Sequence, residues 1–227
     1  MSIASAIQDI KKSLPQRVQL VAVSKFNPIE ALWEAYHAGQ RIFGESQAQE
    51  MVPKAQAMPD DVKWHFIGHL QTNKVKYIAP YVACIESVDS LKLLVEINKQ
   101  ALKNNRIIPC LLQFHVAQEE TKSGLTQREC EDMLCSDEFA NLRNIRIDGV
   151  MGMASNTDDE ARVRADFAEI ARLFVYFKIH YFATSPHFKH ISMGMTHDYP
   201  IAIQEGATLI RVGSGIFGER MYQNHYK

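Results

Sequence analysis

The sequence lacks the features that would place a protein in a membrane or bind it to a polyanion. Its longest apolar runs, such as I107-I108-P109-C110-L111-L112, are too short to cross a bilayer. The formal net charge is −1, so no overall field attracts nucleic acid or anionic lipid. The first residues resemble an amphipathic helix and not a signal peptide. We therefore expect a protein that binds neither membranes nor nucleic acids.

Cysteine is scarce and unpaired in its spacing. The four cysteines, at 84, 110, 130 and 135, form no C-x-x-C pair and no zinc-ligand pattern. We expect reduced thiols that act as small core residues, in a cytoplasmic protein. His65 and His69 are no metal pair either, because residues i and i+4 of a strand lie ~13 Å apart. No linker, low-complexity tract or charge run divides the chain, which predicts one domain over residues 1–227.

What the sequence has is a regular alternation of short apolar runs and segments with helical spacing. The predicted strands are 20–24, 41–45, 64–69, 84–88, 108–116, 147–153, 190–193 and 208–212. The predicted helices between them are 28–38, 47–56, 72–77, 90–103, 127–135, 158–178 and 200–204. This order predicts a (β/α)8 TIM barrel with an extra N-terminal helix at 3–12. A doubly wound open sheet is the competing architecture.

Period-2 alternation places two cations at one end of this barrel. Val21, Val23 and Lys25 share one face of the first strand, so Lys25 is expected to point inward at its carboxyl end. By the same rule Leu209 and Arg211 share a face of the last strand. The first and last strands of a closed barrel are neighbours. We therefore expect Lys25 and Arg211 to meet at the rim where barrel enzymes hold their chemistry.

A glycine-rich stretch follows the last strand. G213-S214-G215-I216-F217-G218 matches G-x-G-x-x-G, but a dinucleotide fold needs a further strand with an acidic ribose ligand, and the sequence up to Lys227 offers none. In barrels, the loops after strands 7 and 8 often bind phosphate through backbone N–H groups. Ser192 could add a hydroxyl donor there. The alternative is that these glycines only turn the chain.

Motifs along nearly the whole chain are similar to those of the pyridoxal phosphate homeostasis protein family. They are A-V-S-K at 22–25, F-G-E at 43–45, W-H-F-I-G-H-L-Q-T-N-K at 64–74, S-V-D at 87–89, G-V-M at 149–151, S-M-G-M-T-H-D at 192–198 and R-V-G-S-G-I-F-G-E-R at 211–220. The resemblance implies a barrel like the N-terminal domain of alanine racemase, with pyridoxal 5′-phosphate as cofactor. This chain has Ser46 where the family usually has Asn, and Thr196 where Ser is commoner.

The resemblance also implies roles for individual residues. Lys25 would carry the cofactor as a Schiff base, and Arg211 would face the pyridine nitrogen. The phosphate would be held by Ser192, Gly213 and Ser214. A Schiff base needs a neutral amine, and both burial and the charge of Arg211 would lower the pKa of Lys25. Arginine can only donate a hydrogen bond to the ring nitrogen, which makes the cofactor a weak electron sink.

Three functions remain open on these residues. The first is a monomeric carrier that buffers pyridoxal phosphate in vitamin B6 homeostasis, with apo-enzymes as recipients. The second is a weak amino-acid racemase, although racemisation needs acid/base groups on both faces of the substrate and the resemblance supplies only Lys25 for one face. The third is a phosphosugar aldolase that uses the same lysine.

Overall fold

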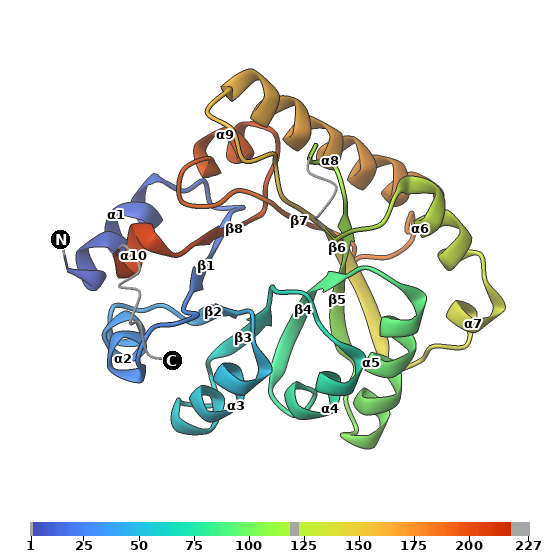
Figure 1. Ribbon diagram of the computed structural model, residues 1–227, viewed down its shortest axis with the longest axis horizontal. Helices are drawn as coiled ribbons and strands as arrows, with labels where there is room; N and C mark the ends of the chain where they lie inside the picture. Colours follow the sequence, from blue (N-terminus) through green and yellow to red (C-terminus); the bar gives the residue numbers. More distant parts are fainter. Residues whose placement is uncertain (1, 119–122, 219–227) are drawn as a thin grey trace, which may run out of the picture.

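The computed structural model describes residues 2–118 and 123–218, in which parallel strands β1 to β8 close into a barrel (Figure 1). Each strand pairs with the next in sequence order, and β8 pairs with β1 so that Val21 lies opposite Arg211. The predicted (β/α)8 barrel is confirmed, and the open sheet is excluded. The strands are Gln19–Val23, Ile42–Glu45, Lys63–Phe66, Val82–Val88, Ile108–Phe114, Ile145–Gly152, His190–Ser192 and Leu209–Val212.

Helices form a layer outside the strands (Figure 1). They are α1 Ile3–Ser13, α2 Ile29–His37, α3 Ala48–Ala57, the 3₁₀ turn η1 Thr72–Lys74, α4 Val75–Ile78, α5 Leu91–Lys103, α6 Gln127–Leu134, α7 Asp137–Ala140, α8 Glu160–His180, α9 Tyr199–Gln204 and α10 Ser214–Phe217. The predicted N-terminal helix is α1, which packs against α2 and α10 and so fills the gap in the layer between them. No helix in the described part of the chain is long and apolar enough to span a membrane.

Several helix ends follow from local chemistry. The Ser90 hydroxyl accepts a hydrogen bond from the Leu93 N–H and caps α5, as its sequence position indicates. Gly39 and Gly206 follow α2 and α9 with φ of 84° and 100°, the left-handed conformation in which helices commonly end. The helix predicted over 28–38 begins one residue later than expected, because Pro28 is the residue before α2. The expectation missed by one position.

The other differences from the predicted boundaries concern two strand ends and the shortest helices. β3 ends at Phe66 and β5 at Phe114, before the apolar residues that continue each run. The predicted helix at 72–77 divides into η1 and α4. α7 and α10 were not predicted, because a helix of four residues is too short to show a hydrophobic period.

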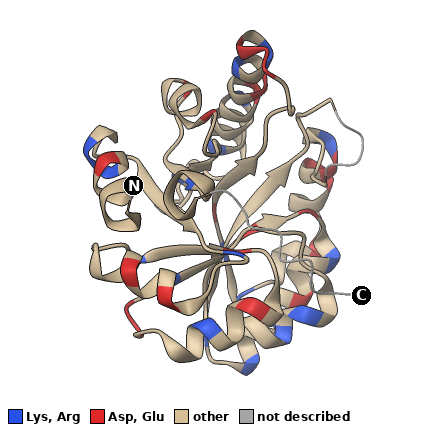
Figure 2. Ribbon diagram, turned by 60° about the vertical axis from the view of Figure 1, so that its left-hand side comes forward, with Lys and Arg blue, Asp and Glu red and all other residues tan. Residues whose placement is uncertain are grey.

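The barrel wall separates two apolar clusters. The inner one is small and consists of side chains from different strands: Val21, Cys84, Leu111, Met151 and Leu209. The outer one is the main core, between the strands and the helices. Figure 2 shows acidic and basic residues mainly on the outer helices, with a few near the barrel centre.

The cysteines are free thiols. Three of them are buried as expected, and burial raises the pKa of Cys84, Cys110 and Cys130. Cys135 is exposed, so the expectation of a core residue was wrong at that position. It follows α6 directly, on the outer surface, where no second layer covers it.

Candidate functional site

A polar layer lies above the inner apolar cluster, toward the carboxyl ends of the strands. Glu86 is two residues beyond Cys84 on β4, and Arg211 is two residues beyond Leu209 on β8, so each shares the inward face of its strand. Glu86 is fully buried and Arg211 is only 4% exposed. A buried carboxylate and a buried guanidinium therefore face each other inside the barrel.

Hydrogen bonds join this pair to two more side chains. Arg211 donates to the Ser192 Oγ at 2.6 Å and to the Gly152 carbonyl at 3.0 Å. The Ser192 hydroxyl donates to Glu86 Oε2 at 2.5 Å, and Arg211 Nη1 lies 3.9 Å from the same oxygen. His65 Nδ1 is 2.5 Å from Glu86 Oε1. An ionised carboxylate only accepts, so this ring nitrogen carries a proton. We call His65, Glu86, Ser192 and Arg211 the inner network.

The electrostatics of the inner network keep Glu86 ionised. Burial by itself raises the pKa of Glu86, but the hydrogen bonds from His65 and Ser192 and the charges of His65 and Arg211 outweigh it, so the pKa lies below its usual value. Burial lowers the pKa of Arg211, and the charge of Glu86 opposes that effect. Because arginine stays protonated in proteins, the network contains a fixed cation that can donate to a ligand.

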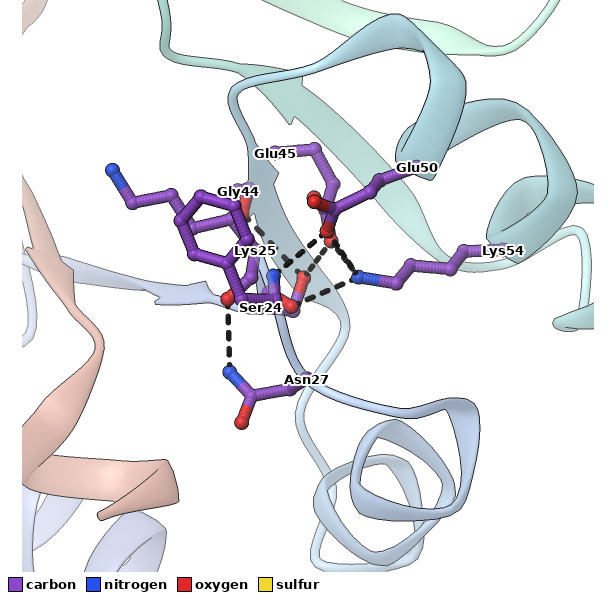
Figure 3. A network of polar contacts seen from close by, with 8 residues as sticks. Ser24, Lys25, Asn27, Gly44, Glu45, Glu50 and Lys54 are labelled. Carbon is purple, nitrogen blue, oxygen red and sulfur yellow. Dashed lines mark hydrogen bonds and ion pairs between the residues drawn. The ribbon is translucent and has the colours of Figure 1, made fainter. Parts of the chain in front are cut away.

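Lys25 lies just beyond the end of β1, in a turn. β1 ends at Val23, and Lys25 is half-buried. Ser24 is fully buried and its hydroxyl donates to Glu45 Oε1 at 2.6 Å, on the side of the wall that faces α3. Figure 3 shows that Lys54 of α3 approaches the turn from one side and that the Lys25 side chain extends away from the turn on the other side. Ser24 and Lys25 thus extend in different directions from the end of β1, and the inward orientation of Lys25 stays a prediction.

Hydrogen-bond donors converge beside this turn, after β8, at Gly213 and the first residues of α10. The backbone N–H groups of Gly213 and Gly215 and the hydroxyl of Ser214 all lie 3.2–3.4 Å from Thr196 Oγ1. We call this arrangement the amide cradle. A Cβ built on Gly213 would lie 3.4 Å from the Cβ of Val23, so the cradle is adjacent to the end of β1. In the structure the Thr196 hydroxyl accepts both N–H groups. N–H groups gathered at the start of a helix are also the kind of donor that binds phosphate.

The structure places the five predicted site residues in two groups. Gly213 and Ser214 are in the amide cradle. Gly213 is adjacent to Val23, which is two residues before Lys25 in the sequence. Arg211 and Ser192 are in the inner network. Ser192 is fully buried, and its only hydroxyl proton is directed at Glu86. Its predicted role as a phosphate ligand stays a prediction.

Glu86, His65 and the cradle role of Thr196 were not anticipated from the sequence. For Glu86 a signal was present: C84-I85-E86-S87-V88 places a carboxylate on an otherwise apolar strand, which requires a buried partner. Thr196 retains the hydroxyl of the commoner serine, and that hydroxyl is the atom on which the cradle donors converge.

The fold and this rim define a (β/α)8 barrel with a lysine just beyond the first strand and a group of hydrogen-bond donors after the last. Residues 2–221 match the family described as alanine racemase, N-terminal domain. The pyridoxal phosphate homeostasis protein of Aquifex aeolicus is 38% identical over 90% of this chain and 88% of its own length. That of Escherichia coli K12 is 32% identical over 92% of this chain and 88% of its own.

Solved structures give the same result. PipY of Synechococcus elongatus PCC7942 with pyridoxal phosphate bound is 34% identical, with a TM-score of 0.86 over 96% of this chain and 100% of PipY. Alanine racemase from Bartonella henselae is 15% identical, with a TM-score of 0.69 over 99% of this chain and 60% of its own, a likeness of fold alone. The chain belongs to the alanine racemase N-terminal domain family and, within it, to the pyridoxal phosphate homeostasis proteins.

Proposed function

We propose that this chain binds pyridoxal 5′-phosphate at the carboxyl end of its barrel and acts in vitamin B6 homeostasis as a carrier of the cofactor. The observation that carries the proposal is the juxtaposition of the Lys25 turn with the amide cradle at neighbouring strands β1 and β8. The names of the relatives and the cofactor bound to PipY support it. The cofactor supplies an aldehyde, which reacts reversibly with amines.

In this proposal each group of residues has one task. The Lys25 amine nitrogen bonds to the aldehyde carbon as a Schiff base, and one water leaves. The cradle at Gly213, Ser214 and Thr196 holds the phosphate. Arg211 donates to the pyridine nitrogen, and because it cannot accept a proton from that ring, it favours storage of the cofactor over carbanion chemistry.

Three accompanying statements stay predictions. They are that apo-enzymes receive the cofactor, that the protein is a cytoplasmic monomer, and that residues 1–227 form a single domain. Size-exclusion chromatography with light scattering tests the monomer.

Borohydride reduction followed by intact mass measurement tests the proposed function. Wild-type protein incubated with pyridoxal phosphate should gain the mass of one pyridoxyl phosphate group, because borohydride fixes the Schiff base as a stable amine. Peptide mapping should place the group on Lys25, and the Lys25→Ala variant should gain no mass. An adduct of equal yield on Lys25→Ala would overturn the assignment.

A pair of variants tests the role of the Thr196 hydroxyl in the cradle. Thr196→Val removes the hydroxyl at the centre of the cradle, so we expect its affinity for pyridoxal phosphate to fall about tenfold, the effect of about 1.4 kcal/mol of lost hydrogen bonding. Thr196→Ser, which keeps the hydroxyl, should bind like the wild type. Titration followed by absorbance measures both.

Ser192→Ala tests the predicted phosphate role of Ser192 in the same assay. If Ser192 belongs to the inner network alone, competition by inorganic phosphate should be unchanged in this variant, since the cradle is intact. If Ser192 also binds the phosphate, inorganic phosphate should compete as poorly as it does in Thr196→Val.

A further inference from the structure

A partly buried ion cluster lies on the outer side of the barrel wall, behind the Lys25 turn (Figure 3). Glu45 ends β2, and Glu50 and Lys54 lie on α3. Lys54 Nζ donates to the Ser24 carbonyl at 2.9 Å, to Glu45 Oε1 at 2.8 Å and to Glu50 Oε2 at 3.2 Å. An ammonium has three N–H donors, so these contacts use all of them. We call Glu45, Glu50 and Lys54 the outer ion cluster.

The outer ion cluster holds both chain neighbours of Lys25. On one side, Ser24 is bound twice, through its carbonyl to Lys54 and through its hydroxyl to Glu45. On the other side, the Phe26 N–H donates to Glu50 Oε2 at 2.7 Å. The residue between them, Lys25, is therefore part of a backbone turn that is fixed at each end.

The backbone of this turn needs such restraint. Phe26 has a φ of 66°, in the left-handed region that bulky residues rarely adopt. Residues keep such a conformation only where their surroundings enforce it, and these positions gather at functional sites. The Phe26 N–H to Glu50 bond is one restraint of that kind.

The outer ion cluster is also costly to bury. The side chains of Glu45 and Lys54 are 0% and 11% exposed, and Glu45 Oε2 has no hydrogen-bond partner within the described residues. Burial raises the pKa of Glu45, and the charge and hydrogen bond of Lys54 and the hydrogen bond of Ser24 oppose the rise. Apolar side chains of similar volume would commonly stabilise such a position as well or better. Stability alone therefore does not account for the cluster.

We propose that Lys54, together with Glu45 and Glu50, is a positioning group that fixes the Ser24–Phe26 turn so that the Lys25 amine meets the aldehyde. The inference rests on the proposed function, because it concerns the same lysine. It assigns to the far side of the wall a part in ligand capture, although no atom of the outer ion cluster contacts the ligand.

Lys54→Met tests the inference, since methionine fills similar space without the ammonium. Its binding of pyridoxal phosphate should weaken at least about tenfold, because misplacing a reacting group by ~1 Å can cost up to about a hundredfold. Pyridoxine 5′-phosphate has the same ring and phosphate but no aldehyde, so its binding does not depend on the position of the Lys25 amine. Its affinity for Lys54→Met should stay within a factor of about two of wild type. A loss that is equal for both ligands would show a merely structural role and overturn the proposal.

Arg146→Met is the matched control. Arg146 pairs with the buried Asp148 at the amino end of β6, far along the strand from the rim, so its loss also leaves a buried carboxylate without its cation. We expect this variant to lose stability and to bind both ligands as the wild type does. If it reproduced the selective loss expected of Lys54→Met, the proposal would fail.

Two variants of Glu50 cover the case in which Lys54→Met does not fold. Glu50→Gln keeps an oxygen acceptor for the Phe26 N–H, and Glu50→Leu does not. Selective loss of aldehyde capture in Glu50→Leu, with recovery in Glu50→Gln, supports the inference, and equal behaviour of the two contradicts it. A wild-type protein that gains no borohydride adduct would instead refute the proposed function itself.

Discussion

Glu86→Ala should destabilise the protein by about 3–5 kcal/mol, the usual cost of removing one partner from a buried ion pair. The substitution leaves the Arg211 guanidinium, which is 4% exposed, without the carboxylate that faces it. It also removes the acceptor of the Ser192 hydroxyl and of His65 Nδ1. Urea unfolding measures the loss as a lower midpoint with an unchanged slope.

The destabilisation should depend on pH in a defined direction. The folded-state pKa of Glu86 lies below its ordinary value of 4.5, so the ionised carboxylate stabilises the fold above that pH. The contribution is lost as the pH falls through the lowered folded-state pKa. The stability difference between wild type and Glu86→Ala should therefore be constant from pH 7 down to about pH 4.5 and shrink below it.

An exposed ion pair provides the control for Glu86. Glu205 contacts Arg164 at 2.6 Å, with the arginine side chain 45% exposed, so Glu205→Ala should cost less than about 1 kcal/mol. If Glu86→Ala cost no more than Glu205→Ala, the inner network would not be a buried charge pair, and the fixed position of Arg211 would need another explanation.

Gly149→Ala is expected to be at least as damaging, with a loss above about 4 kcal/mol or no folded protein. Gly149 has a φ of 155° and pairs with His190 of β7. A Cβ there would lie 1.9 Å from the His190 carbonyl oxygen, which belongs to the backbone and cannot swing away. The β5–β6 register shifts just before Gly149, so this close approach belongs to a bulge in β6.

Gly206→Ala separates the steric effect at Gly149 from the backbone effect. Gly206 also has a positive φ, of 100°, but a Cβ there would meet nothing within 4 Å. It should cost only the conformational strain, about 1–3 kcal/mol. Equal midpoints for the two variants in urea or heat would contradict the clash that we expect at Gly149.

The barrel could be predicted from the sequence because its signals are local. Each strand is a short apolar run followed by a helix, and the alternation along β1 correctly places Val21 in the inner apolar cluster. The ends of β3 and β5 could not be predicted, since apolar residues beyond Phe66 and Phe114 continue the pattern after the strands have ended. The residue at which a strand ends depends on where its neighbouring strands stop pairing with it, and a local sequence pattern does not contain that information.

The inner network and the outer ion cluster could not be predicted, for a different reason. Glu86 and Ser192 are 106 residues apart in sequence, and a hydrogen bond at that separation depends on how eight strands close. Thr196 and residues 213–215 come together through the same closure. The sequence identified residues that could do the chemistry, while the three-dimensional arrangement decided their partners.

The burial of Cys84 inside the barrel has a chemical consequence for a protein that stores an aldehyde. Sulfur competes with amines for carbonyl carbons, and its reactive form is the thiolate. Burial, with a smaller contribution from Glu86, holds the pKa of Cys84 well above its usual value, and the inner apolar cluster surrounds it. The sulfur below the polar layer thus stays protonated and enclosed, so under the proposed function it does not compete with the Lys25 amine for the aldehyde.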